Sequence, residues 1–231
     1  MSGLFTYSAY DESIKSVMTS HVLVTDSRLV LIDPIDLTAN DLEEVGKLGV
    51  LESICLTTES HTRFASGLRE KFNVRVFVHA AADPSVRSQA DKTFRDLDLL
   101  PGDLTAIEIP GVKPSESAFF LDRDGGVMLV GDALTNLKGL DFLPDKYCAN
   151  PQQSRDSLRK LLVYEFKTLC FGHGEPLRGY PKAALRNLLS QKPALAGKKS
   201  SSETSDEPCG LAAGPASAWR GSDPSYPDPR R

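Results

Sequence analysis

Residues 117–134, with the sequence SAFFLDRDGGVMLVGDAL, predict two apolar strands joined by a tight turn. The turn falls at Asp124-Gly125-Gly126, and these residue types are typical of turns. The second strand, Val127–Val130, is a continuous apolar run, as expected for a strand that is covered on both faces. Asp132 follows where this buried strand meets the surface. We therefore expect Asp132 to be either a ligand or the cap of the following loop.

The chain on both sides of this hairpin alternates short apolar strands with amphipathic helices. Strands are expected at residues 22–25, 29–32, 51–56, 74–79, 104–109 and 168–171. Helices are expected after Thr38 with Asp41 in a capping box, over Phe64-Leu68-Phe72, over Val86-Ala90-Phe94, after the cap Asn150, and around residues 184–189. The pattern predicts one domain of mixed α and β structure over residues 1–195.

Composition limits the class of protein. The chain has 231 residues, of which 40% are hydrophobic and 25% charged, as in ordinary soluble domains. No apolar run approaches the roughly 20 residues that span a bilayer, and the first residues do not resemble a secretory signal. We therefore expect a cytoplasmic protein without a membrane partner. The net charge of −4 also argues against a nucleic-acid partner. The sequence indicates no oligomeric state.

Residues 196–231 change in composition to Lys, Ser, Glu, Gly, Ala and Pro, which predicts a disordered tail. Trp219, the only tryptophan, lies in this tail. It is either a docking residue for a partner or an incidental exposed aromatic. The four cysteines Cys55, Cys148, Cys170 and Cys209 have no Cys-x-x-Cys spacing, and we expect no disulfides.

The order of short motifs resembles that of the metallo-beta-lactamase superfamily over roughly residues 18–192. The motifs are Leu31-Ile32-Asp33-Pro34, Leu56-Thr57-Thr58, Ile109-Pro110-Gly111, Val130-Gly131-Asp132 and Gly172-His173-Gly174. The resemblance implies a four-layer αββα sandwich with two mixed sheets face to face. It also implies a dinuclear metal site at one edge of the sheets, with ligands from the loops.

Most of the ligand positions implied by this resemblance hold other residues. The ligand loop of the family, Thr-His-x-His-x-Asp-His, would place its ligands on Thr58, Ser60, Thr62 and Arg63, and the next histidine on Val112. Only Asp132 and His173 match. The resemblance therefore points to a degenerate branch with no dinuclear metal pair, in which Arg63 could pair with Asp132. The main expectation is that no metal is bound.

An alternative keeps one metal ion. If the loop slips by one residue, Glu59 and His61 approach the ligand positions beside Asp132 and His173. Two imidazoles and two carboxylates would suit one divalent metal such as zinc.

Charged residues of the motifs are expected to meet at one rim: Arg63, His61, Lys113, Glu116, Asp132, Lys146 and His173. In one interpretation, salt bridges replace a lost metal, and the protein is a non-catalytic binding or regulatory protein. In the other, the protein is hydrolase-like. Asp132, His173 and Glu116 are then catalytic, with Glu116 or His173 as general base, and Lys113, Lys146, Arg63 and His61 bind a small anionic ligand.

Overall fold

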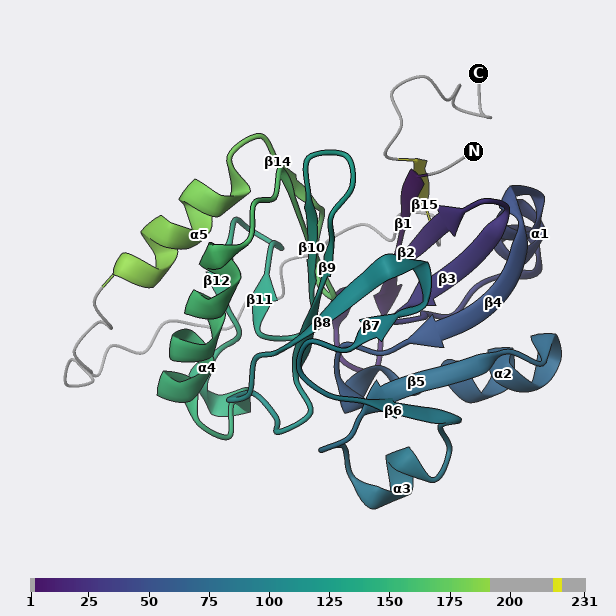
Figure 1. Ribbon diagram of the computed structural model, residues 1–231, viewed down its shortest axis with the longest axis horizontal. Coiled ribbons are helices and arrows are strands. Elements are labelled where there is room, and N and C mark those ends of the chain that lie inside the picture. The colour runs from purple at the N-terminus through teal and green to yellow at the C-terminus, as the bar shows by residue number, and fades with distance from the viewer. Residues whose placement is uncertain (1–2, 192–217, 222–231) are drawn as a thin grey trace, which may run out of the picture.

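Two β-sheets lie face to face in the computed structural model, and helices cover both outer faces (Figure 1). The structure describes residues 3–191 and 218–221. The first sheet has the order β15 (Ala218–Gly221), β1 (Gly3–Asp11), β2 (Ser16–Thr25), β3 (Arg28–Ile32), β4 (Val50–Cys55), β5 (Arg75–His79) and β6 (Lys92–Phe94). The second has the order β14 (Leu177–Arg178), β13 (Thr168–Phe171), β10 (Val127–Val130), β9 (Ser117–Leu121), β8 (Leu104–Glu108) and β7 (Leu99–Leu100). A separate pair joins β11 (Leu134–Thr135) to β12 (Asp141–Phe142).

Two helices, α1 and α4, begin where the sequence places their caps. Helix α1 (Ala39–Leu48) has the expected capping box between Thr38 and Asp41. Helix α4 (Pro151–Leu158) begins after Asn150, whose side chain accepts from the backbone N–H of Gln153. The remaining helices are α2 (Ala65–Phe72), α3 (Pro84–Arg87) and α5 (Pro181–Ser190), with 3₁₀ turns at η1 (Glu59–His61), η2 (Pro101–Asp103), η3 (Asp145–Tyr147) and η4 (Arg159–Val163).

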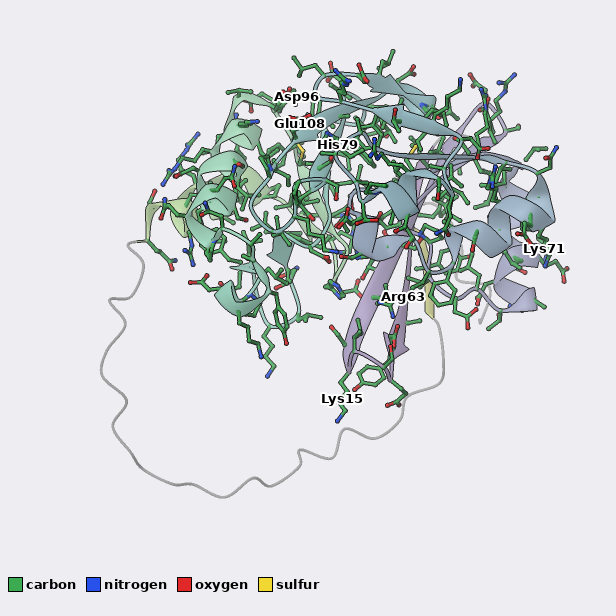
Figure 2. The ribbon with its side chains drawn as sticks, turned by 90° about the horizontal axis from the view of Figure 1, so that it is seen from below. Lys15, Arg63, Lys71, His79, Asp96 and Glu108 are labelled. Atoms are coloured by element: carbon green, nitrogen blue, oxygen red, sulfur yellow. The ribbon has the colours of Figure 1, made fainter. Side chains whose placement is uncertain are left out.

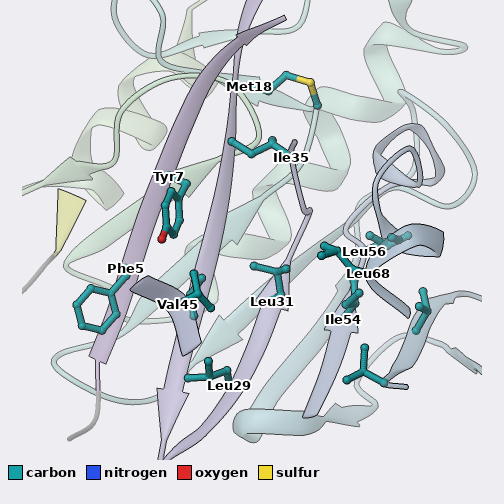
Figure 3. Packing of buried hydrophobic residues seen from close by; sticks show 14 of the residues in the cluster. Phe5, Tyr7, Met18, Leu29, Leu31, Ile35, Val45, Ile54, Leu56 and Leu68 are labelled. Carbon is teal, nitrogen blue, oxygen red and sulfur yellow. The ribbon is translucent and has the colours of Figure 1, made fainter. Parts of the chain in front are cut away.

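Three hydrophobic cores separate four layers. One lies between the first sheet and helices α1 and α2, and includes Val45 and Leu68 (Figure 3). A second lies between the two sheets, and a third lies between the second sheet and helices α4 and α5. In β10, Val127 and Leu129 contribute to the core between the sheets, whereas the alternate residues belong to the outer core. The run Val127–Val130 is thus covered on both faces, and the predicted αββα sandwich is confirmed.

Strand direction brings several loops to one edge. Strands β3, β4, β5 and β6 are parallel in the first sheet, and β10 is parallel to β13 in the second. Loops at the carboxyl ends of such strands are frequent ligand sites. Asp33, His61, Asp132 and His173 all follow the carboxyl ends of these strands.

Three features differ from the sequence-based expectations. The helix expected over Val86-Ala90-Phe94 is wrong, because α3 ends at Arg87 and Phe94 lies in β6, where pairing with β5 outweighs the helical spacing. Strand β1 was not expected. In the tail, Ala218–Gly221 forms strand β15, which pairs with β1 and places Trp219 opposite Tyr7 in the register, and disorder of the tail stays a prediction. The rest of the tail, from residue 196 onward, lies outside the described residues.

Candidate metal centre

Three side chains from three loops meet at the sheet edge. The Nε2 atom of His61 lies 3.2 Å from Oδ1 of Asp132, and Nε2 of His173 lies 3.3 Å from the same oxygen. One ligand atom from each residue lies within 4.8 Å of the others. His61 is at the end of η1 after β4, Asp132 follows β10, and His173 follows β13. The group therefore joins the first sheet to the second.

Asp33 lies beside the Nδ1 atom of His61, and Thr57 donates two hydrogen bonds to Asp33. The Nδ1 atom of His61 lies 3.2 Å from Oδ2 of Asp33. Asp33 accepts hydrogen bonds from the backbone N–H of Thr57 at 2.8 Å and from its hydroxyl at 2.5 Å. Nδ1 of His61 is buried and makes no aligned hydrogen bond, so Asp33 acts on the ring through its negative charge. The sequence analysis places Asp33 in one of the family motifs but does not assign it to the site.

His173 is held by the neighbouring strand β2. Its Nδ1 atom lies 2.8 Å from the carbonyl oxygen of Val17. A carbonyl only accepts, so Nδ1 carries the proton and a neutral ring turns the lone pair of Nε2 toward Asp132. The Nε2 atoms of His61 and His173 thus both face Oδ1 of Asp132.

The donor set fits a single divalent ion. Oδ1 of Asp132 is buried and makes no hydrogen bond, because neither imidazole contact is well aligned for one. His61, Asp132 and His173 would hold one divalent ion such as zinc, because each offers one ligand atom and the three atoms lie within 4.8 Å of one another. Bound there, the ion would supply Lewis-acid chemistry.

Without a metal, two carboxylates flank His61 and favour its protonated form. Burial opposes the charge, but Asp33 and Asp132 outweigh it and raise the pKa of His61 well above its usual value. Burial likewise opposes the charge on Asp132, yet His61 and His173 lower the pKa of that carboxyl below its usual range. A proton on His61 and a metal ion therefore compete for the same nitrogen.

Glu116 is a buried carboxyl beside this group. Its Oε1 atom accepts from the backbone N–H of Ala133 at 3.1 Å, while Oε2 makes no hydrogen bond. Burial and the charge of Asp132 raise the pKa of Glu116 to about 8, against the opposing effect of His61. Glu116 is therefore largely protonated at neutral pH.

Two glycines allow these groups to approach one another. A Cβ on Gly131 would lie 2.4 Å from Oγ1 of Thr57 and 2.9 Å from Oε1 of Glu116. A Cβ on Gly172 would lie 2.6 Å from Cε1 of His61. Each glycine comes directly before a candidate ligand. The pairs Gly131-Asp132 and Gly172-His173 are therefore the sequence signal of this packing.

The structure does not bring the other predicted residues into the group. Arg63 pairs with Asp11 at 2.6 Å, so its expected pairing with Asp132 is wrong. Figure 2 shows Arg63 near the hairpin of β1 and β2, whose tip carries Lys15. Arg63 follows η1, so its side chain can reach the hairpin while His61 remains in the site.

Glu59 and the two lysines also lie outside the group. Glu59, expected as a fourth ligand, instead pairs with Lys113 at 3.2 Å and accepts from the backbone N–H of Asp83. Lys146 lies 4.7 Å from the ring centre of Tyr147. Because Arg63 and Lys113 already face carboxylates, only Lys146 of the three expected cations has no carboxylate partner in the described part of the chain. The small anionic ligand stays a prediction.

The two remaining histidines are buried structural residues. His79 accepts from the backbone N–H of Ala81 through Nδ1, so Nε2 carries the proton and donates to Glu108 at 2.8 Å. Figure 2 shows His79, Glu108 and Asp96 together, far from Lys15. His21 lies between the sheets.

Over residues 3–191 and 218–221, no helix is long and apolar enough to cross a bilayer.

The fold and the site together are an αββα sandwich with a His/Asp/His group at the carboxyl ends of its parallel strands. The chain belongs to the metallo-beta-lactamase superfamily, because the sequence profile of that superfamily matches residues 2–190. A search of curated proteins gives no match.

Solved structures show the same fold at low identity. The BLEG-1 B3 metallo-beta-lactamase has a TM-score of 0.61 and 18% identity, with 83% of this chain and 100% of that chain covered. A metallo-beta-lactamase family protein from Thermus thermophilus has a TM-score of 0.61 and 20% identity, covering 81% and 77%. ETHE1 from Myxococcus xanthus has a TM-score of 0.61 and 19% identity, covering 79% and 82%.

Proposed function

We propose that this protein is a hydrolase that uses one divalent metal ion held by His61, Asp132 and His173. The observation that carries the proposal is the convergence of their three ligand atoms within 4.8 Å. Support comes from the outer nitrogens of both rings, which face Asp33 and the carbonyl of Val17. This is the mononuclear alternative of the sequence analysis with Glu59 omitted.

A divalent ion at this position supplies a Lewis acid that polarises a substrate oxygen and makes water a better nucleophile. The carbonyl of Val17 orients the ring of His173, Asp33 contacts the ring of His61, and Asp132 supplies the negative charge that balances the cation. His173 is engaged as a ligand, so the acid–base role falls to Glu116. Its raised pKa, about 8, suits a group that holds and returns a proton near neutral pH.

A second candidate is a non-catalytic binding protein without a metal. The contacts that favour it are the two carboxylates on either side of His61, since a protonated imidazole between them forms a balanced buried network. The two candidates differ in whether a divalent ion displaces that proton.

The experiment is a metal analysis of protein purified without chelator and then reloaded with Zn²⁺ or Mn²⁺. The hydrolase proposal expects close to one ion per chain, a higher melting temperature with metal, and hydrolysis of at least one ester, thioester, lactam or phosphodiester substrate. Asp132→Asn should abolish metal uptake, whereas the exposed control Asp122→Asn should not. Wild-type protein that takes up neither ion contradicts the hydrolase proposal and supports the metal-free network.

A further inference from the structure

Strand β2 holds the backbone of the loop that carries His173. The backbone N–H of Thr19 donates to the carbonyl of Gly172 at 2.8 Å, and the Thr19 hydroxyl donates to the carbonyl of Gly174 at 3.2 Å. These carbonyls stand on either side of His173. Thr19 is buried, so water does not compete for either bond.

His21 holds the carbonyl that precedes this pair. Its Nε2 atom lies 3.1 Å from the carbonyl oxygen of Phe171, so Nε2 carries the proton and donates. Its Nδ1 atom lies 3.1 Å from the hydroxyl of Thr6 on β1, which can then donate to the neutral ring. His21 therefore fixes the loop and is itself fixed by the next strand.

These bonds cross from one sheet to the other. Thr19 and His21 belong to the first sheet, whereas Phe171 ends a strand of the second. Among the candidate ligands, His61 comes from the first sheet and His173 from the second. The spacing of the two imidazoles consequently depends on how the loop after β13 is seated on β2.

We infer that Thr19 and His21 are positioning residues that place His173 for metal binding, an inference that rests on the proposed metal site. Neither side chain reaches the ligand atoms. Thr19 bonds the carbonyls on both sides of His173, while His21 bonds the end of β13. The contact between Nδ1 of His173 and Val17, two residues before Thr19, then selects which ring nitrogen faces Asp132.

The test compares Thr19→Val with Ser157→Ala, which is a matched control. Both changes remove a largely buried hydroxyl that donates to a loop carbonyl, but Ser157 donates to Pro110 at 2.9 Å, in a loop without a candidate ligand. Zinc affinity of the full chain is measured by competition with a chromogenic chelator, after circular dichroism has shown that each variant is folded. Mutation of a residue that hydrogen-bonds to a metal ligand typically lowers the metal affinity by about 10–100-fold.

We expect zinc affinity to fall by about 10–100-fold in Thr19→Val, to recover in Thr19→Ser, and to stay near the wild-type value in Ser157→Ala. The two variants that lose a hydroxyl should have similarly lowered melting temperatures. His21→Gln, which keeps an amide donor for Phe171, should bind zinc more tightly than His21→Leu. Equal affinities in Thr19→Val and Ser157→Ala, or no recovery in Thr19→Ser, would overturn the inference.

A second readout does not need the metal. In zinc-free protein, at a pH where the ring is neutral, ¹H–¹⁵N NMR should show the proton of His173 on Nδ1 in wild type and a mixture of tautomers in Thr19→Val. If wild type takes up no zinc, the proposed function fails and this measurement alone decides the positioning role. An unchanged tautomer in Thr19→Val would then contradict that role.

Discussion

Replacing Gly131 by alanine tests why the site needs a glycine at this position. The glycine either leaves space for the neighbouring side chains or allows a backbone conformation that other residues rarely adopt. The φ angle of Gly131 is not in the left-handed region, so an alanine adopts this backbone without strain. The added Cβ would lie 2.4 Å from Oγ1 of Thr57, which donates to Asp33, and Asp33 faces His61. A single methyl group therefore acts on the candidate ligand His61 through two intermediate residues.

The expected cost follows from these distances. A Cβ at 2.4 Å must displace Thr57, and inserting a methyl group into a packed core costs about 1–3 kcal/mol. For a chain of this size that corresponds to roughly 3–9 °C in melting temperature. Thr57→Ala should cost about 1.5–3 kcal/mol, because it removes a charge-assisted hydrogen bond to Asp33. The double variant should cost about 1–2 kcal/mol less than the sum, since the alanine at position 57 no longer meets the methyl group.

The measurement is urea unfolding followed by far-ultraviolet circular dichroism in chelator. Gly67→Ala in α2 is the control: nothing lies within 4 Å of the position its added Cβ would take, and it should be neutral or stabilising by up to about 1 kcal/mol. Strict additivity of Gly131→Ala and Thr57→Ala would refute the reasoning.

Three further predictions concern charge. Zinc uptake should release a proton from His61, so zinc affinity should rise with pH up to the raised pKa of that imidazole. Calorimetry in two buffers of different ionisation enthalpy measures this release, and it would detect none if His61 were neutral. Burial lowers the pKa of His21 to about 4, so between pH 4 and 6.5 the unfolded chain binds more protons than the folded chain. The free energy of unfolding should therefore fall by about 3 kcal/mol as the pH drops through this window. A His21→Gln variant with the same pH dependence as wild type would contradict this prediction. Burial raises the pKa of Glu116, so the contribution of this carboxyl to stability is lost as the pH rises from about 4.5 to 8. Glu116→Gln should therefore be more stable relative to wild type at pH 8 than at pH 4.5. A stability difference between variant and wild type that does not depend on pH would argue against the raised pKa.

The fold could be predicted because its signals are local. The apolar run Val127–Val130, the capping box at Thr38 and the cap at Asn150 each report on a few neighbouring residues. The helix expected through Phe94 failed because pairing with β5, a contact between separate elements, decided the conformation there. Strand β1 was missed because polar residues and tyrosines interrupt its apolar pattern.

The candidate site was harder to predict than the fold. Asp132 and His173 are found from their motifs, but the place of His61 depends on how η1 turns the loop after β4. The sequence pattern offered two registers, and only the structure shows His61 facing Asp132 while Arg63 faces Asp11. The support from Val17, Thr19 and His21 could not be predicted, because these residues precede His173 by about 150 positions and no local pattern connects them.

This long separation has a consequence for how the protein folds. The chain must close a loop of some 150 residues before β2 meets the loop after β13, and contacts of such separation form slowly and late. Strand β2 therefore cannot position the imidazole of His173 until β13, which lies some 150 residues later in the chain, is in place. A truncated chain that ends before β13 lacks His173 and should not complete the three-residue group, and capture of zinc during refolding should coincide with the final kinetic phase.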